Sequence, residues 1–166
     1  MIVDANLLLY LADDANPRHA HVLQWWTRQL GEGRRLGVPV QSIAAYLRIA
    51  TRTNLPFTPT PPDVAARIVA NWLDSDGVWV PAASERTVTA YLTLSARHPV
   101  TGPPVPDAML AAMALEHGVA VASTDGRALN LATPSTYPLK AGWGYLLTGQ
   151  AWMVDSPGEW FHDAAA

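Results

Sequence analysis

The chain has 166 residues, which suits a single domain, and 49% of them are hydrophobic while 15% are charged. This composition excludes a disordered chain, the lack of cysteine excludes disulfides and thiolate metal sites, and no apolar run reaches the roughly 18 residues of a membrane span. The net charge of −3 excludes a basic field over the whole protein, but it is compatible with a local basic patch beside an acidic pocket.

The first half of the chain alternates short apolar runs with helical patterns. "MIVD" predicts a strand over 1–4, and a helix follows from Ala5 to Ala12. Asn16 is a candidate cap and Pro17 a candidate first residue for a second helix that ends near Leu30. A second strand is expected over 36–40, a helix opened by Ser42 over 43–51, and a proline-rich loop after it.

The second half continues the same alternation. A helix is expected from Pro62-Asp63 to Leu73, a third strand over 78–81, and a helix from Ser84-Glu85 to about Ala96. After a second Pro/Gly loop, Pro106 opens a helix that ends near Gly118, and "VAVAST" predicts a fourth strand over 119–124. The order predicts an α/β fold with a central parallel sheet of about four strands.

Three aspartates are expected at one edge of that sheet. Asp4 and Asp125 directly follow the first and fourth strands, and Asp107 stands at the start of the helix that leads into the fourth. Ligands of open α/β sheets bind outside the carboxyl ends of the strands. Carboxylates that converge there repel each other unless a divalent cation such as Mg²⁺ or Mn²⁺ lies among them, and such a cation can activate water against a phosphodiester.

Each aspartate also has an ordinary structural interpretation. Asp4 can cap the helix that follows it, Asp107 can complement a helix dipole, and Asp125 in "STDG" can be a turn residue. Taken singly, these interpretations are favoured; the three positions together shift the balance toward a site.

Three segments, "MIVDANLLLY", "AAYLRIAT" and "PDAMLAAMALEHGVAVASTD", resemble the PIN domains of VapC-type toxins from bacterial toxin–antitoxin pairs. The resemblance covers about residues 1–125 in order and spacing. It implies a three-layer α/β/α sandwich and an endoribonuclease that depends on Mg²⁺ or Mn²⁺ and cleaves tRNA or rRNA. It also implies inhibition by a cognate VapB-like antitoxin and a homodimer. A cytoplasmic protein with no membrane association is expected from the lack of cysteine and of a long apolar run.

The resemblance assigns roles to individual residues. Asp4, Asp107 and Asp125 match the family's metal-binding acids and are the expected catalytic residues. Asn6 matches the polar residue that orients the first acid, and Thr124 matches a hydroxyl just before the last. For contact with the RNA backbone the candidates are Arg48, Arg52 and Arg127, although an ordinary ion pair explains Arg48 equally well.

The chain departs from the family pattern at two places. Many PIN domains have a glutamate where this chain has Ala45, and Glu116 cannot replace it because it lies roughly 13 Å along the helix from Asp107. We therefore place the PIN domain at 1–130 and an atypical extension at 131–166, where "GYLLTGQAWMV" predicts two short strands around "TGQ" as a hairpin packed on the domain.

These departures keep a second hypothesis open, in which a catalytically weakened PIN-like domain binds protein or RNA. A phosphohydrolase is disfavoured because Asn6 stands where haloacid-dehalogenase-like enzymes have a second aspartate. A receiver domain is disfavoured because the single lysine, Lys140, lies in the tail. The RNA target and the identity of the antitoxin do not follow from the sequence.

Overall fold

The computed structural model describes residues 1–54, 58–97, 102, 105–124, 145–146, 151–156 and 159–163, the last three segments by their backbone alone. The helices are α1 Ala5–Ala12, α2 His19–Gly31, α3 Val40–Ala50, α4 Pro62–Leu73, α5 Glu85–Arg97 and α6 Val105–His117. The strands are β1 Ile2–Val3, β2 Leu36–Gly37, β3 Val78–Trp79, β4 Val121–Ser123, β5 Tyr145–Leu146, β6 Ala151–Ser156 and β7 Glu159–Asp163.

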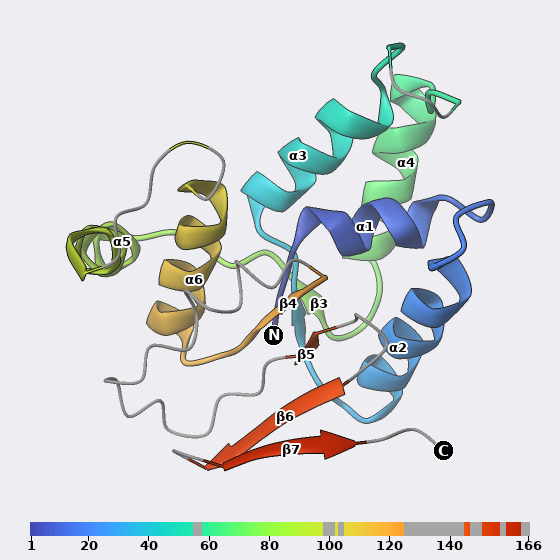
Figure 1. The fold of residues 1–166 in the computed structure, drawn as a ribbon. Helices are drawn as coiled ribbons and strands as arrows, with labels where there is room; N and C mark the ends of the chain where they lie inside the picture. The colour runs from blue at the N-terminus through green and yellow to red at the C-terminus, as the bar shows by residue number, and fades with distance from the viewer. Residues whose placement is uncertain are drawn as a thin grey trace.

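The main sheet is parallel and has the strand order β3-β2-β1-β4-β5 (Figure 1). β1 lies inside it, with Ile2 opposite Gly37 of β2 on one side and Val121 of β4 on the other. The predicted α/β fold with four parallel strands is confirmed, and β5 adds a fifth.

Helices cover both faces of the sheet because neighbouring strand residues point to opposite sides. Val3 belongs to a buried cluster with α1, α2, α3 and α4, whereas Ile2 belongs to a second cluster with α5 and α6. Both residues are 0% exposed. The predicted three-layer sandwich follows from this alternation.

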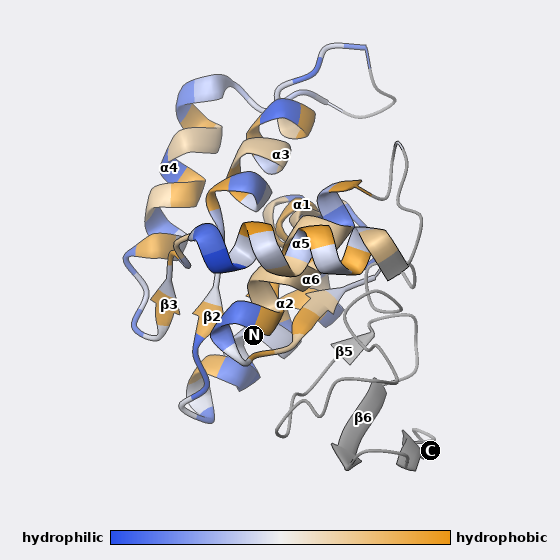
Figure 2. Ribbon diagram, turned by 90° about the vertical axis from the view of Figure 1, so that its left-hand side faces the viewer, coloured by the Kyte–Doolittle hydropathy of each residue, from blue (hydrophilic) through white to orange (hydrophobic). Residues whose placement is uncertain are grey.

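Helix α5 forms the outer part of the second layer. In Figure 2 it faces the viewer and carries hydrophilic and hydrophobic residues along its length, as expected for a helix with one packed face. Among the described helices, none is long and apolar enough to cross a membrane.

Two predicted helix starts are wrong. α2 begins at His19, because the side-chain oxygen of Asn16 accepts from the backbone N–H of Arg18 and its carbonyl accepts from His19, so that Asn16 forms a turn. α3 begins at Val40, two residues before Ser42. Ser42 is buried within that helix and donates its hydroxyl to the carbonyl of Val3, 2.8 Å away.

The C-terminal region contains the two strands expected around "TGQ", β5 and β6, but they do not pair as a hairpin. β5 pairs with β4 in the main sheet, and β6 pairs antiparallel with β7. The domain boundary near residue 130 stays a prediction.

Helix α6 is joined to α5 by a carboxylate near its end. Glu116 accepts hydrogen bonds from the hydroxyls of Ser84 and Thr87, and the ring of His117 is 3.0 Å from the carbonyl of Ala82. The two hydroxyl donors, Ser84 first, lower the pKa of the Glu116 carboxyl. Glu116 thus holds the start of α5 and lies away from the predicted acidic site.

This arrangement predicts a pH-dependent contribution to stability. A carboxyl whose pKa is lower in the folded state stabilises the fold above its unfolded pKa, and the stabilisation is lost as pH falls through the folded pKa. Glu116→Gln should therefore lower the free energy of unfolding at neutral pH and change it less in acid. Urea titrations at both pH values measure this, with the exposed Glu85→Gln as control; an equal loss at both pH values would contradict it.

Candidate active site

The carboxyl ends of β1 and β4 form the point where the strand order reverses. From β1 the chain proceeds to β2 and β3 on one side, and β4 is added on the other. Asp4 follows β1 directly, and its backbone N–H donates to the carbonyl of Ala122 at 2.9 Å. Ser123 is the last residue of β4. Such a switch point opens a crevice in doubly wound sheets, so it is the expected place for a ligand.

The Asp4 carboxylate is held by three hydrogen-bond donors. Oδ1 accepts from the backbone N–H of Ala5 at 2.6 Å, so Asp4 does cap α1. Oδ2 accepts from Asn6 Nδ2 at 3.0 Å and from Ser123 Oγ at 2.6 Å. The cap and the predicted site are therefore compatible, because donors to both oxygens fix the orientation of a charged carboxylate.

Asn6 connects the ends of the two strands. Its amide nitrogen also lies 3.0 Å from Ser123 Oγ, and its amide oxygen accepts from the backbone N–H of Thr124 at 3.4 Å. One side chain on α1 thus contacts Asp4 and two residues at the end of β4.

The hydroxyl beside Asp4 belongs to Ser123, which the sequence reasoning missed in favour of Thr124. Ser123 is 0% exposed although it is polar, and it ends an otherwise apolar strand. A buried serine needs a hydrogen-bond partner, so a serine at the end of an apolar strand could have indicated this role from the sequence.

Asp107 lies in the first turn of α6 and is partly exposed. α6 contacts both β1 and β4, and it precedes β4 in a parallel sheet, so its first turn lies toward the edge where the strands end (Figure 1). Asp125 and Arg127 lie outside the described residues. The described residues by themselves contain no group of three candidate metal ligands.

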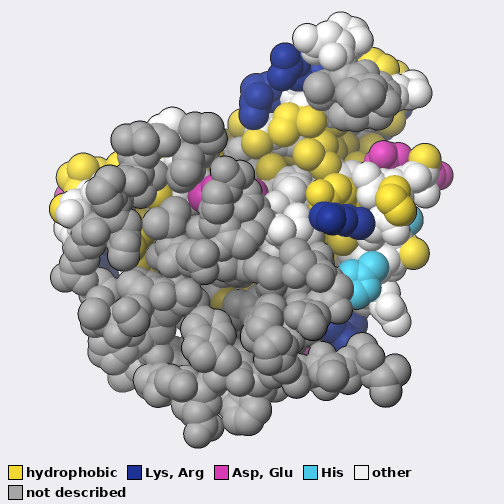
Figure 3. All heavy atoms as spheres, in the orientation of Figure 1, with side chains coloured by type: hydrophobic (Ala, Val, Ile, Leu, Met, Phe, Trp, Pro, Cys, Tyr) yellow, Lys and Arg dark blue, Asp and Glu magenta, His cyan; other side chains and the backbone are white. Residues whose placement is uncertain are grey.

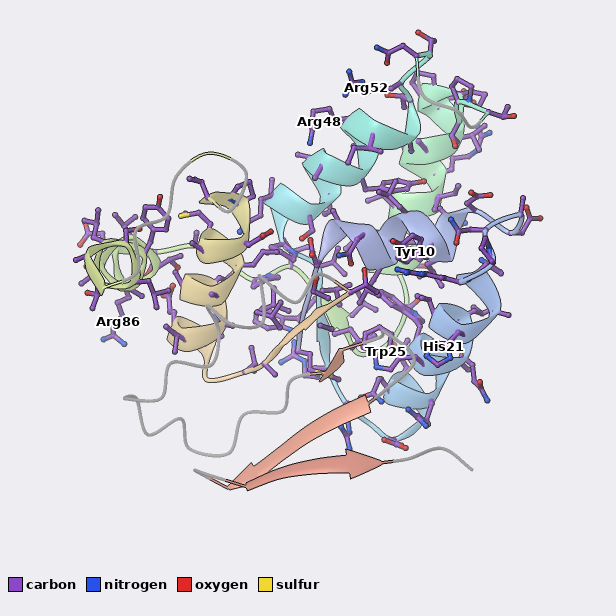
Figure 4. All side chains as sticks on the ribbon, in the orientation of Figure 1. Tyr10, His21, Trp25, Arg48, Arg52 and Arg86 are labelled. Carbon is purple, nitrogen blue, oxygen red and sulfur yellow. The ribbon has the colours of Figure 1, made fainter. Side chains whose placement is uncertain are left out.

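The two described arginine candidates are exposed on α3 and just after it. Arg48 and Arg52 are four residues apart and project from the same side of α3, where basic side chains gather at the upper end of the molecule (Figures 3 and 4). Arg52 Nε donates to Asn54 Oδ1 at 3.2 Å. Ala45, on the same helix, leaves the position of the family glutamate without a carboxylate.

The contacts of Asn6 lead to a prediction for a positioning residue. Asn6→Ala removes one donor to Asp4 and one acceptor for Thr124, so the carboxylate loses part of its orientation. For the nuclease activity that the family resemblance implies, we expect the rate to fall by about 10- to 100-fold, as for other residues that orient a site's ligands. Cleavage kinetics measure the loss. Asn71→Ala, on the exposed side of α4, is the matched control and should keep full activity; an unchanged rate in Asn6→Ala would contradict the role.

Comparison with known proteins supports the same assignment. The PIN domain family model matches residues 1–133. Ribonuclease VapC37 of Mycobacterium tuberculosis is 31% identical over 124 residues, which cover 75% of this chain and 86% of the relative.

Two solved structures share the fold. The FitAB complex bound to a DNA fragment matches with a TM-score of 0.55 and 18% identity, and covers 79% of this chain and 89% of the other. VapBC2 from Rickettsia felis, also bound to DNA, matches with a TM-score of 0.53 and 10% identity, covering 75% and 86%. The family match spans most of the chain and the ribonuclease match exceeds 30% identity, so the chain belongs to the VapC family of PIN-domain ribonucleases.

Proposed function

We propose that this chain is the toxin of a type II toxin–antitoxin pair and cleaves RNA as an endoribonuclease dependent on Mg²⁺ or Mn²⁺. The observation that carries the proposal is the Asp4 carboxylate, which three donors orient at the switch point between β1 and β4. The relatives named ribonuclease VapC supply the reaction class.

The donor set fits a hard divalent cation. Such cations prefer carboxylate oxygens, and Asp4 presents two of them at the edge of the sheet where β1 and β4 end. Asp4 and Asp107 would hold the ion together with Asp125, the third acid that the family resemblance assigns. When bound, the ion would supply Lewis-acid stabilisation of a phosphodiester oxygen and make water a better nucleophile.

The remaining roles belong to the protein. Asn6 and Ser123 keep the Asp4 carboxylate in one orientation, because both donate to the same oxygen. Arg48 and Arg52 attract the phosphates of the RNA backbone from the exposed side of α3. The two solved structures of similar fold are those of VapBC2 and FitAB, each bound to DNA. Their names join two components, and this supports an antitoxin as the protein partner of the present chain. We also propose that this chain forms a homodimer and that it acts in the cytoplasm.

Metal removal tests the proposed chemistry. Purified protein should cleave single-stranded RNA in Mg²⁺ or Mn²⁺ and lose that activity in a chelator. Carboxylates alone cannot stabilise the negative charge that develops on the phosphodiester oxygens, whereas a bound metal ion can. Return of the metal should restore cleavage, as measured on a labelled oligoribonucleotide. Equal cleavage in chelator would overturn the metal mechanism. A protein with no cleavage in either metal would favour the binding module suggested by Ala45.

A further inference from the structure

A pocket of about 340 Å³ opens where the end of α1 meets the end of α3. Its wall is formed by the last turn of α1, the turn that leads to α2, the last turns of α3 and the segment 58–60. This volume lies in the range of pockets that bind small ligands or single side chains. Asp4 and Asp107 do not line it, so it is separate from the candidate active site.

One of the residues that line the pocket, Tyr46, has a buried hydroxyl. Tyr46 lines the pocket and is 0% exposed, and its ring packs at 5.0 Å against Trp72. Within the described part of the chain, the buried Tyr46 hydroxyl has no hydrogen-bond partner. Burial also raises the pKa of Tyr46, which keeps the group a neutral hydroxyl. A buried polar atom without a hydrogen-bond partner lowers the stability of the fold. A ligand that forms a hydrogen bond with this hydroxyl would remove that cost and bind more tightly for it.

The rim of the pocket is acidic. Asp13 and Asp14 both line it and are exposed, and among the described residues that line it none is lysine or arginine. Asp13 Oδ1 already accepts from the backbone N–H of Ala15 at 3.2 Å, which holds this carboxylate at the rim. A cation at the mouth would therefore face two carboxylates.

Tyr10, which lines the pocket, is already in contact with the guanidinium group of Arg18. Arg18 donates to the Tyr10 hydroxyl at 3.2 Å, and its guanidinium lies 5.2 Å from the centre of the Tyr10 ring. Arg18 is not among the described residues that line the pocket. The Tyr10 ring thus shows the kind of contact that a cationic ligand would make.

The pocket and the exposed arginines lie on different sides of α3. Tyr46 and Ala50 line the pocket, whereas Arg48 projects from α3 away from α1 and Tyr10 (Figure 4). Successive residues of a helix are about 100° apart, so Arg48 lies on nearly the opposite side from Tyr46. An RNA backbone drawn to Arg48 would not approach Asp13 and Asp14, which would repel its phosphates.

From these observations we propose that the pocket binds one lysine or arginine side chain of a peptide segment from a protein partner. The apolar wall, which includes Leu9 and Ile49, accepts the aliphatic stem, and the carboxylates of Asp13 and Asp14 accept the charged group. The proposal does not depend on RNA cleavage, because neither of the described catalytic candidates, Asp4 and Asp107, lines the pocket.

Short peptides test the proposal with the full chain. Blocked Gly-Xaa-Gly peptides with arginine, lysine, leucine or glutamate in the centre are titrated into protein with labelled tyrosines, and NMR follows Tyr10, Tyr46 and Tyr91. We expect saturable shifts of Tyr10 and Tyr46 with arginine and lysine, and none at Tyr91 on α5. Asp13→Asn with Asp14→Asn should weaken arginine-peptide binding on the order of 10-fold, as two exposed ion pairs are lost.

Two further variants separate binding from folding. Asp63→Asn with Asp74→Asn, on and after α4, removes the same charge elsewhere and should leave binding unchanged. Tyr46→Phe should weaken peptide binding without lowering the melting temperature, because the hydroxyl it removes has no partner in the described structure.

Three outcomes would overturn the proposal: no saturable shift with any basic peptide, equal binding of the glutamate peptide, or unchanged binding in the Asp13/Asp14 double variant. A single-stranded oligouridylate is titrated in the same way, to test whether the pocket binds RNA instead of a peptide. If it shifts Tyr10 and Tyr46 while the basic peptides do not, the pocket binds nucleic acid and the peptide assignment is wrong. RNA cleavage by the double variant is measured separately, so a failure of the proposed enzyme is distinguished from a failure of the pocket.

Discussion

Asp4→Asn is expected to abolish both RNA cleavage and toxicity on expression while leaving the fold intact. The substitution removes the negative charge and replaces one acceptor oxygen, so Ser123 and Asn6 lose a partner for their donors at the Oδ2 position. Loss of a preorganised electrostatic group commonly lowers the rate by on the order of 100-fold or more. Asparagine is as good a helix cap as aspartate, so α1 should still form. Cleavage of a labelled RNA and growth after induction measure the two effects.

Asp63→Asn is the matched control for this experiment. Asp63 is exposed on α4 and pairs with Arg67 at 2.9 Å, a surface contact that contributes little to stability. It should retain activity and toxicity. Full cleavage by Asp4→Asn in Mg²⁺ would overturn the proposed mechanism, whereas loss of activity in both variants would point to a general effect of charge.

Leu8→Ala is expected to destabilise the protein by about 2–5 kcal/mol, as for other buried leucines. Leu8 is 0% exposed and lies in the cluster formed by α1, α2, α3 and α4. The truncation leaves a cavity beneath α1, the helix that Asp4 caps, so the site loses its rigid support as well. Urea-induced unfolding followed by circular dichroism measures the change.

The corresponding control is Leu23→Ala on α2. Leu23 is 44% exposed, so the same chemical change removes far fewer contacts. Its free energy of unfolding should change by less than about 1 kcal/mol. Similar losses in the two variants would show that the α1 interface is not the tightly packed core described above.

The sequence predicted the helices best where local chemistry and packing agree. α1 and α4 have the predicted bounds, because an acid before α1 and a proline at the start of α4 mark their first turns. The predicted start of α2 was wrong because an asparagine such as Asn16 can either cap a helix or form a turn. The prediction that Ser42 opens α3 was wrong for another reason. The Ser42 hydroxyl donates to the carbonyl of Val3, 39 residues away in the chain, and does not cap the helix.

The candidate site was predicted only as far as its topology. Asp4 follows the first strand as expected, because a strand ending and a charged residue are both local signals. The contact between Asn6 and Ser123 joins residues 117 positions apart, and no local pattern encodes it. Glu116 likewise contacts Ser84, just before α5, and Thr87 on α5, and the geometry of its own helix does not indicate these contacts.

The place of β1 in the sheet has a consequence for synthesis of the protein. Its two residues are made more than a hundred residues before β4, yet Ile2 and Val3 pair with Val121 and Ala122, and Ser123 provides a donor to Asp4. A nascent chain on the ribosome therefore carries Asp4 without its partners until β4 has emerged. Contacts of such sequence separation form late because the loop between them must close. The oriented carboxylate that the proposed active site needs is therefore assembled only after residue 123 has been translated.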